Sequence, residues 1–210
     1  MHYIIYTTDF IYNQKSTEEL ISLSNQGDEL AIAILGDRYF EQNDLQSSYK
    51  YYSIIADKGY LIAQINVALI AKYLKNDKLA IKYLNMAVEQ QDPYASFLLG
   101  QYCQAGKAGG IFHMKAAFKH YLYAAKAGIS EAQFKISCMY RLGKGTKKSF
   151  KDFNFWLACA YINENEQAIR TVNHVFSQEF HLLKKQFLEE TCPYIIENYS
   201  QYIPEYFRKK

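Results

Sequence analysis

Residues 31–39, AIAILGDRY, decide the fold because a similar pattern returns along the chain. The returning segments begin at Ala63, Ala95 and Ala132, and a fifth alanine, Ala168, follows. The alanines are 32, 32, 37 and 36 residues apart. Such a period is the signature of stacked helical repeats. A small residue recurs five positions after four of the alanines: Gly36, Ala68, Gly100 and Ser137.

A second landmark lies twelve residues before each following alanine. Its interval to that alanine never changes, so all variation in repeat length falls earlier in the repeat. Apolar residues around this landmark have helical spacing, as in Leu45, Tyr49, Tyr52 and Ala56. Each repeat is therefore predicted to be a helix A, a turn of variable length and a helix B. The landmark residues are Tyr51, Tyr83, His120 and Trp156.

Helices of about a dozen residues are marginal alone in water, so the predicted pairs must stack on one another. The sequence thus predicts an all-α solenoid of about four antiparallel helix pairs in a single folded unit. Gly36 and Gly100 suit close helix crossings, and Gly59 and Gly128 suit helix ends. We expect an N-terminal cap over 1–27, with a lone helix B starting at Ser16, repeats over 28–168 and capping helices over 169–210.

The composition favours a protein without cofactor, metal or membrane segment. The net charge of +3 shows no long single-sign block, so neither nucleic acid nor membrane is expected as a partner. The four cysteines form no C-x-x-C pair, which predicts buried thiols in a reducing compartment. No apolar run could span a bilayer, and residues 1–10 lack a basic region typical of an export signal. We expect a cytoplasmic location.

The later copies carry a family resemblance. In the third copy it rests on Ala95, Leu99-Gly100, Tyr121, Ala124-Ala125 and Gly128. In the fourth it rests on Ala132, Tyr140, Gly143-Lys144-Gly145, Trp156 and Ala160. These strings resemble the Sel1-like repeat family, a relative of tetratricopeptide repeats, and the first two copies, which lack G-x-G, are closer to compact tetratricopeptide units. The resemblance implies a right-handed superhelix that acts as a protein-interaction scaffold. It also implies several bacterial roles: adaptors, host-interacting factors and immunity proteins against secreted toxins.

In the related repeats, the concave face is lined by fixed positions of helix A. Carried over residue by residue, these positions include an apolar patch with Arg141, Arg170 and Asp37 at its rim. We expect this patch to bind a partner protein; the alternative is that superhelical curvature buries some of its side chains. The patch consists of Ile62, Ile65, Leu69, Tyr73, Tyr94, Phe97 and Phe134.

No sequence motif indicates catalysis. A hydrolase remains an alternative, but no set of acid, base and nucleophile is apparent. Lys144, Lys147, Lys148 and Lys151 cluster in the predicted turn of the fourth copy and are interpreted as a solvated loop, with an acidic partner or nucleic acid as the alternative. The function expected from the sequence is that of a non-enzymatic adaptor or inhibitor, or, more narrowly, of an immunity protein.

Overall fold

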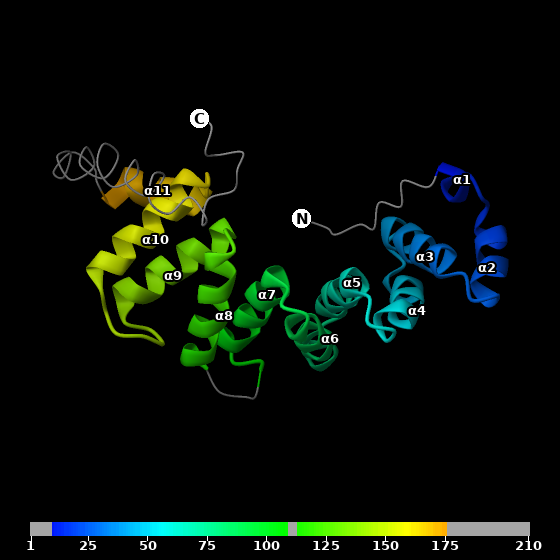
Figure 1. Ribbon diagram of the computed structural model, residues 1–210, viewed down its shortest axis with the longest axis horizontal. Coiled ribbons are helices and arrows are strands. Elements are labelled where there is room, and N and C mark those ends of the chain that lie inside the picture. The colour runs from blue at the N-terminus through cyan, green and yellow to red at the C-terminus, as the bar shows by residue number, and fades with distance from the viewer. Residues whose placement is uncertain (1–9, 109–112, 176–210) are drawn as a thin grey trace. The chain divides into compact units, whose positions relative to one another are not determined.

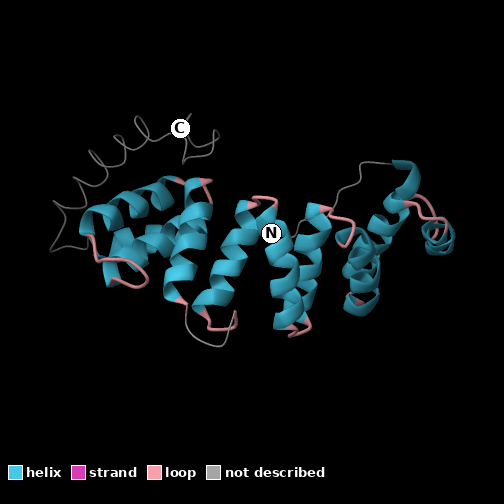
Figure 2. Ribbon diagram, turned by 60° about the horizontal axis from the view of Figure 1, so that its bottom comes forward, coloured by secondary structure: helices cyan, strands magenta, loops and turns pink. Residues whose placement is uncertain are grey.

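The computed structural model describes residues 10–108 and 113–175 of the 210-residue chain. Regular structure in these residues consists of eleven helices, with no strand among them (Figure 2). The contacts divide the chain into two compact units, Met1–Ala95 and Ser96–Lys210, where the sequence favours one. A repeat contacts only its neighbours, so a stack has no central core to enforce a single unit.

The first unit contains two helix pairs preceded by short capping helices (Figure 1). In each pair a helix A, α3 or α5, packs antiparallel against a helix B, α4 or α6, and α4 also packs against α5. The stacking order therefore follows the order of the chain. The elements are α1 (Phe10–Asn13), α2 (Thr17–Asn25), α3 (Glu29–Glu41), α4 (Leu45–Ala56), α5 (Leu61–Tyr73) and α6 (Asp77–Glu89).

The second unit repeats this plan. Helix α7 (Pro93–Gln104) crosses the division between the units and is followed by α8 (Met114–Lys126), α9 (Ser130–Leu142), α10 (Phe150–Ile162) and α11 (Glu166–Val175). The register predicted from the sequence is confirmed, because each landmark alanine is the third residue of its helix A. These residues are Ala31, Ala63, Ala95, Ala132 and Ala168. The residues predicted to form the last C-terminal caps lie outside the described residues.

The start of α2 has the helix cap that the sequence predicts at Ser16. Ser16 precedes α2, and its Oγ accepts a hydrogen bond from the Glu19 backbone N–H at 3.2 Å. The Glu19 carboxylate accepts one in return from the Ser16 backbone N–H at 2.6 Å. This reciprocal capping box satisfies two backbone donors that a helix start would otherwise leave unpaired.

The turn from each helix B to the next helix A contains a left-handed residue at the same position in every repeat. The residue four positions before each landmark alanine has a positive φ, which is +88° at Gly27, +98° at Gly59 and +90° at Gly128. Gln91 and Glu164 occupy the same place with φ of +63° and +55°. A left-handed residue with a side chain costs about 1–2 kcal/mol. The repeat register therefore imposes the turn even where no glycine favours it.

The glycines inside helices A are close crossing points, as predicted. A Cβ on Gly36 would lie 3.0 Å from the ring of Tyr52, and one on Gly100 would lie 2.8 Å from the ring of Tyr121. Both tyrosines belong to the helix B of the same pair and are buried. Glycine lets each aromatic ring lie directly on the helix A backbone.

A buried glutamine joins consecutive helices in the first unit. Gln64, which follows Ala63 in α5, donates from Nε2 to the Ala56 carbonyl at the end of α4, at 3.2 Å. Its Oε1 accepts from Gln90 Nε2, at the end of α6, at 2.8 Å. One side chain thus links the ends of two helices B, and it adds a second hydrogen bond to a carbonyl that also accepts from the Gly59 backbone N–H at 3.0 Å.

The second unit contains the same arrangement at the same register. Gln133, which follows Ala132, donates to the Ala125 carbonyl at 3.2 Å and accepts from Asn163 Nδ2 at 2.8 Å. Gln133 is fully buried. Because a buried polar group without partners is costly, this bridge fixes how neighbouring pairs meet.

Candidate functional site

In the first unit, part of the predicted patch is open to solvent. Ile62 and Tyr73, on α5, are 40% and 58% exposed, and Leu69 between them is half-buried. Ile65, on the same helix, is 1% exposed and belongs to the core. The free surface of α5 is therefore a narrower apolar stripe than the sequence predicts.

Two further residues of this unit that the sequence predicts to contact a partner are half-buried. Tyr94 is half-buried at the start of α7. Asp37, predicted at the rim, is half-buried and accepts a hydrogen bond from the Tyr52 hydroxyl, which ties α3 to α4. Burial, followed by the Asp37 carboxylate, raises the Tyr52 pKa well above its usual range. Asp37 is thus part of the helix-pair packing.

In the second unit, three successive helices A surround a groove of about 460 Å³, here called the helix-A groove. Phe97 from α7 contributes to its lining and is 7% exposed, because its ring packs on that of Tyr121 at 5.8 Å between centroids. The remaining lining is polar. It consists of Gln101, Ser130, Glu131, Lys135, Glu164, Asn165, Glu166 and Gln167.

The charges of the helix-A groove are mixed. Glu131 and Lys135 stand one turn apart on α9. Glu166 pairs with Arg170 at 3.1 Å on α11, and both side chains are about 80% exposed. An ion pair in such full contact with water contributes little to stability. The predicted contact residue Arg170 is accordingly available at the edge of the groove.

The other predicted residues of this unit lie deeper. Phe134 is half-buried on α9. Arg141 is half-buried, and its guanidinium lies 5.8 Å from the centre of the Phe153 ring on α10. Its Nε is buried and has no hydrogen-bond partner among the described residues. Arg141 therefore packs against helix B instead of extending to a solvated rim.

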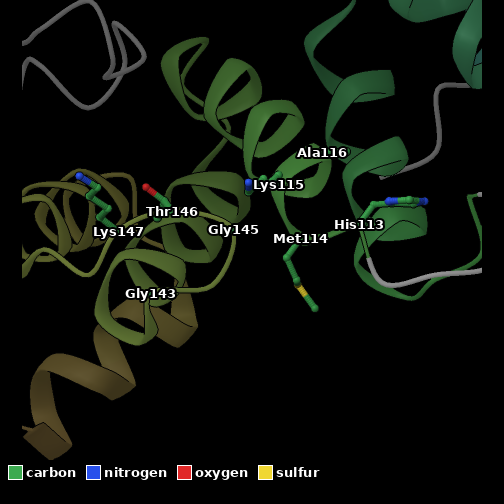
Figure 3. Close-up of a pocket in the computed structure, with 8 residues that line it drawn as sticks. All are labelled: His113, Met114, Lys115, Ala116, Gly143, Gly145, Thr146 and Lys147. Atoms are coloured by element: carbon green, nitrogen blue, oxygen red, sulfur yellow. The ribbon is translucent and has the colours of Figure 1, made fainter.

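A second cavity of about 590 Å³, here called the lysine pocket, lies where the α9–α10 turn meets the start of α8 (Figure 3). Gly145 makes this meeting possible, because a Cβ there would lie 2.2 Å from the Met114 carbonyl oxygen. The sequence favours a solvated loop for this turn, with an acidic partner or nucleic acid as the alternative. The contact between the two segments brings Lys115 and Lys147 to one cavity. The lining residues are His113, Met114, Lys115, Ala116, Gly143, Gly145, Thr146 and Lys147.

Among the described residues, one serine hydroxyl lies within hydrogen-bond distance of a histidine, which is the arrangement of a nucleophile and its general base. Ser96 Oγ lies 3.1 Å from His120 Nδ1, but Ser96 is 2% exposed. Burial, with a smaller effect from Lys119, lowers the pKa of His120. A buried pair without access for a substrate serves packing, and the low pKa keeps the imidazole neutral near pH 7.

The cysteines and acidic groups do not gather into a reactive centre in the part of the chain that is described. Cys103 and Cys159 are buried, Cys138 is half-buried, and all three are free thiols. Burial raises the pKa of the Cys103 thiol, which makes it a poor nucleophile. Among residues 10–108 and 113–175, no three His, Cys, Asp or Glu side chains stand close enough to hold a metal ion. No helix there is long and apolar enough to cross a membrane.

Curated relatives share sequence with about half of the chain. Mouse protein sel-1 homolog 2 is 31% identical over 117 residues, which is 52% of this chain and 17% of that protein. An uncharacterized protein of Neisseria meningitidis serogroup B is 26% identical over 96 residues, 46% of this chain and 20% of that protein. The matched segments thus make up about a fifth of these relatives' length. No protein-family model matches the chain.

Solved structures share the fold over most of the chain. The protein c5321, a protective antigen of uropathogenic Escherichia coli strains with an SLR (Sel1-like repeat) fold, aligns with a TM-score of 0.64 at 22% identity. The alignment covers 85% of this chain and 41% of that one. A Sel1 repeat protein from Oxalobacter formigenes aligns with a TM-score of 0.62 at 20% identity over 76% of this chain and 48% of that one. The all-α arrangement of stacked helix pairs predicted from the sequence is confirmed.

Proposed function

Because the chain is a Sel1-like helical repeat protein, we propose that it is a protein-interaction module that binds a partner along the exposed surface of its helices A. Helical-repeat proteins of this kind present extended surfaces to other proteins. The observation that supports this use is the helix-A groove, which side chains from α7, α9 and α11 line together.

The groove has the properties of a contact site for a peptide segment. Its volume of about 460 Å³ lies within the usual range for binding pockets. Polar groups from three helices surround the small exposed edge of Phe97, so a bound segment would place an apolar side chain at Phe97 and its backbone against the amides of Gln101 and Gln167. Apolar anchors with a polar rim are typical of protein interfaces.

The first unit has a second candidate contact surface, which is apolar where the groove is mostly polar. Ile62 and Tyr73 are large apolar side chains exposed on α5, on the same kind of helix that lines the groove. Aromatic residues often dominate the energy of an interface. The α5 stripe would therefore be a contact of its own in the first unit, whereas the buried Ile65 would contribute only to stability.

The proposal is tested by affinity purification from the organism that makes the protein, with three versions of the full chain as bait. One is the natural sequence, and one carries Glu131→Ala with Gln167→Ala in the groove. The control carries Lys126→Ala with Asn154→Ala, exposed positions on helices B of the same unit. All four positions are exposed, so each substitution should change stability by less than about 0.5 kcal/mol.

The expected result is a protein that the natural chain and the control retain and that the groove variant loses. Direct calorimetric titration of that protein should then give a weaker association with the groove variant only. Equal retention by all three baits, with equal melting temperatures, would contradict binding in the groove.

A further inference from the structure

The charge of the chain is distributed unevenly along the sequence. Residues 93–151 contain ten lysines and arginines and a single acidic residue, Glu131, although the whole chain carries a net charge of only +3. The rest of the chain is therefore net acidic. A total charge near neutrality hides a strongly basic middle segment, which spans helices α7 to α9 and the turn that follows α9.

The fold concentrates part of this charge around the lysine pocket. Lys115 from the start of α8 and Lys147 from the α9–α10 turn both line the cavity (Figure 3). Lys144 and Lys148, in the same turn, are also exposed. Four ammonium groups on two facing segments repel one another unless an anion lies between them. The start of α8 adds a smaller field of the same sign.

Within the described residues, acidic groups do not neutralise this cluster. No carboxylate lines the pocket, and none of the four lysines of the cluster forms an ion pair with a described residue. The nearest acidic residue in the sequence, Asp152, accepts a hydrogen bond from the Ser149 hydroxyl at 2.5 Å and belongs to the start of α10. Lys148 instead lies 5.2 Å from the centre of the exposed Phe150 ring.

We propose that the lysine pocket is a second docking site, separate from the helix-A groove, that takes a short segment of a partner protein rich in aspartate and glutamate. Its volume of about 590 Å³ accommodates a few side chains. Opposite charges across an interface speed association and select partners. The lysine ammoniums would contact the carboxylates, and Thr146 Oγ1 supplies a neutral donor beside them.

A protein segment fits these features better than a nucleic acid. The lining contains no arginine, the residue best suited to phosphate geometry. In the same unit the helix-A groove carries Glu131, Glu164 and Glu166, so the basic surface of this unit is local to the pocket. A short acidic segment matches a basic surface of this extent.

The test uses fluorescence anisotropy with labelled hexaglutamate, hexaglutamine and decathymidylate, at about 50 mM and about 300 mM salt, since screening weakens such contacts. Three forms of the full chain are compared: the natural sequence, Lys115→Glu with Lys147→Glu, and Lys72→Glu with Lys78→Glu. The last pair lies on exposed positions of the first unit and changes the net charge equally. Circular dichroism checks folding, and Lys115→Gln with Lys147→Gln replaces the pocket variant if it does not fold.

Hexaglutamate should bind the natural chain at low salt, hexaglutamine should not, and the pocket variant should bind at least about tenfold more weakly. The Lys72 and Lys78 control should change the affinity by less than about twofold. Three results would overturn the proposal. The natural chain does not bind hexaglutamate at low salt, the pocket variant and the Lys72 and Lys78 control lose affinity equally, or decathymidylate binds more tightly than hexaglutamate. The groove variant Glu131→Ala with Gln167→Ala should keep hexaglutamate binding, so the two sites can fail separately.

Discussion

Replacing Gly145 by alanine should be far more damaging than replacing Gly143, although both glycines lie in the same turn. Each has a left-handed backbone, with φ of +73° and +68°. Alanine in that conformation costs about 1–2 kcal/mol at either site. The two positions differ in their surroundings: a Cβ at Gly143 would meet nothing nearer than 3.5 Å, whereas one at Gly145 would lie 2.2 Å from the Met114 carbonyl oxygen and 2.6 Å from its carbon.

Those two atoms belong to the backbone and cannot rotate away as a side chain does. The turn must separate from the start of α8, and forced repacking of this kind costs about 1–3 kcal/mol more. We therefore expect Gly143→Ala to reduce the free energy of unfolding by about 1–2 kcal/mol. The loss for Gly145→Ala should be about 2–5 kcal/mol. In a chain of this size each 1 kcal/mol lowers the melting temperature by about 2–4 °C.

Urea unfolding followed by circular dichroism measures both losses, and hexaglutamate anisotropy reports on the lysine pocket in the same samples. Gly145→Ala should also weaken hexaglutamate binding, because it separates Lys147 from Lys115, while Gly143→Ala should weaken it less. Equal unfolding free energies for the two variants would refute the reasoning, since the close approach at Met114 would then not limit the fold.

Two other predictions follow from the buried polar groups. His120 has a folded-state pKa lowered by burial, so below the unfolded value near 6.5 the unfolded chain binds a proton that the folded chain excludes. The free energy of unfolding should thus fall as pH drops from 7 towards 5, and His120→Gln should flatten that slope; an unchanged slope would show that His120 is not its source. Gln133→Ala should cost about 1–3 kcal/mol because it removes two buried hydrogen bonds, one to the Ala125 carbonyl and one from the Asn163 amide, whereas the exposed Gln167→Ala should change urea unfolding by less than about 0.5 kcal/mol. Similar losses for the two glutamines would contradict the bridging role.

The sequence predicts the helices well because their determinants are local. The alanine at the third position of each helix A and the Ser16–Glu19 cap are encoded within one or two turns. The glycine beneath an aromatic ring follows from the repeat period, since Gly36 and Tyr52 lie on different helices. The left-handed residues Gln91 and Glu164 are a partial exception. Their position four residues before a landmark alanine identifies them, whereas glutamine and glutamate do not by themselves indicate a left-handed backbone.

The surfaces are less predictable because they depend on how one helix lies against the next. Ile65 and Ile62 are both apolar residues on the same helix, yet one is buried and the other is 40% exposed. Arg141 looks like a rim residue until Phe153, from another helix, is placed beneath it. The lysine pocket needs two segments that are distant in sequence, although counting charges in windows along the chain would have pointed to its region.

The left-handed residues at 27, 59, 91, 128 and 164 act as equivalent joints between repeats. Each of them lies four residues before the next landmark alanine, so a chain that is cut at one and rejoined at another keeps the spacing to that alanine. Such a molecule can gain or lose whole repeats by recombination without a new design for the junction. Apart from the α9–α10 turn, where Gly145 lies against Met114, the turns from helix A to helix B already vary in length and are where an inserted segment would disturb the stacking least.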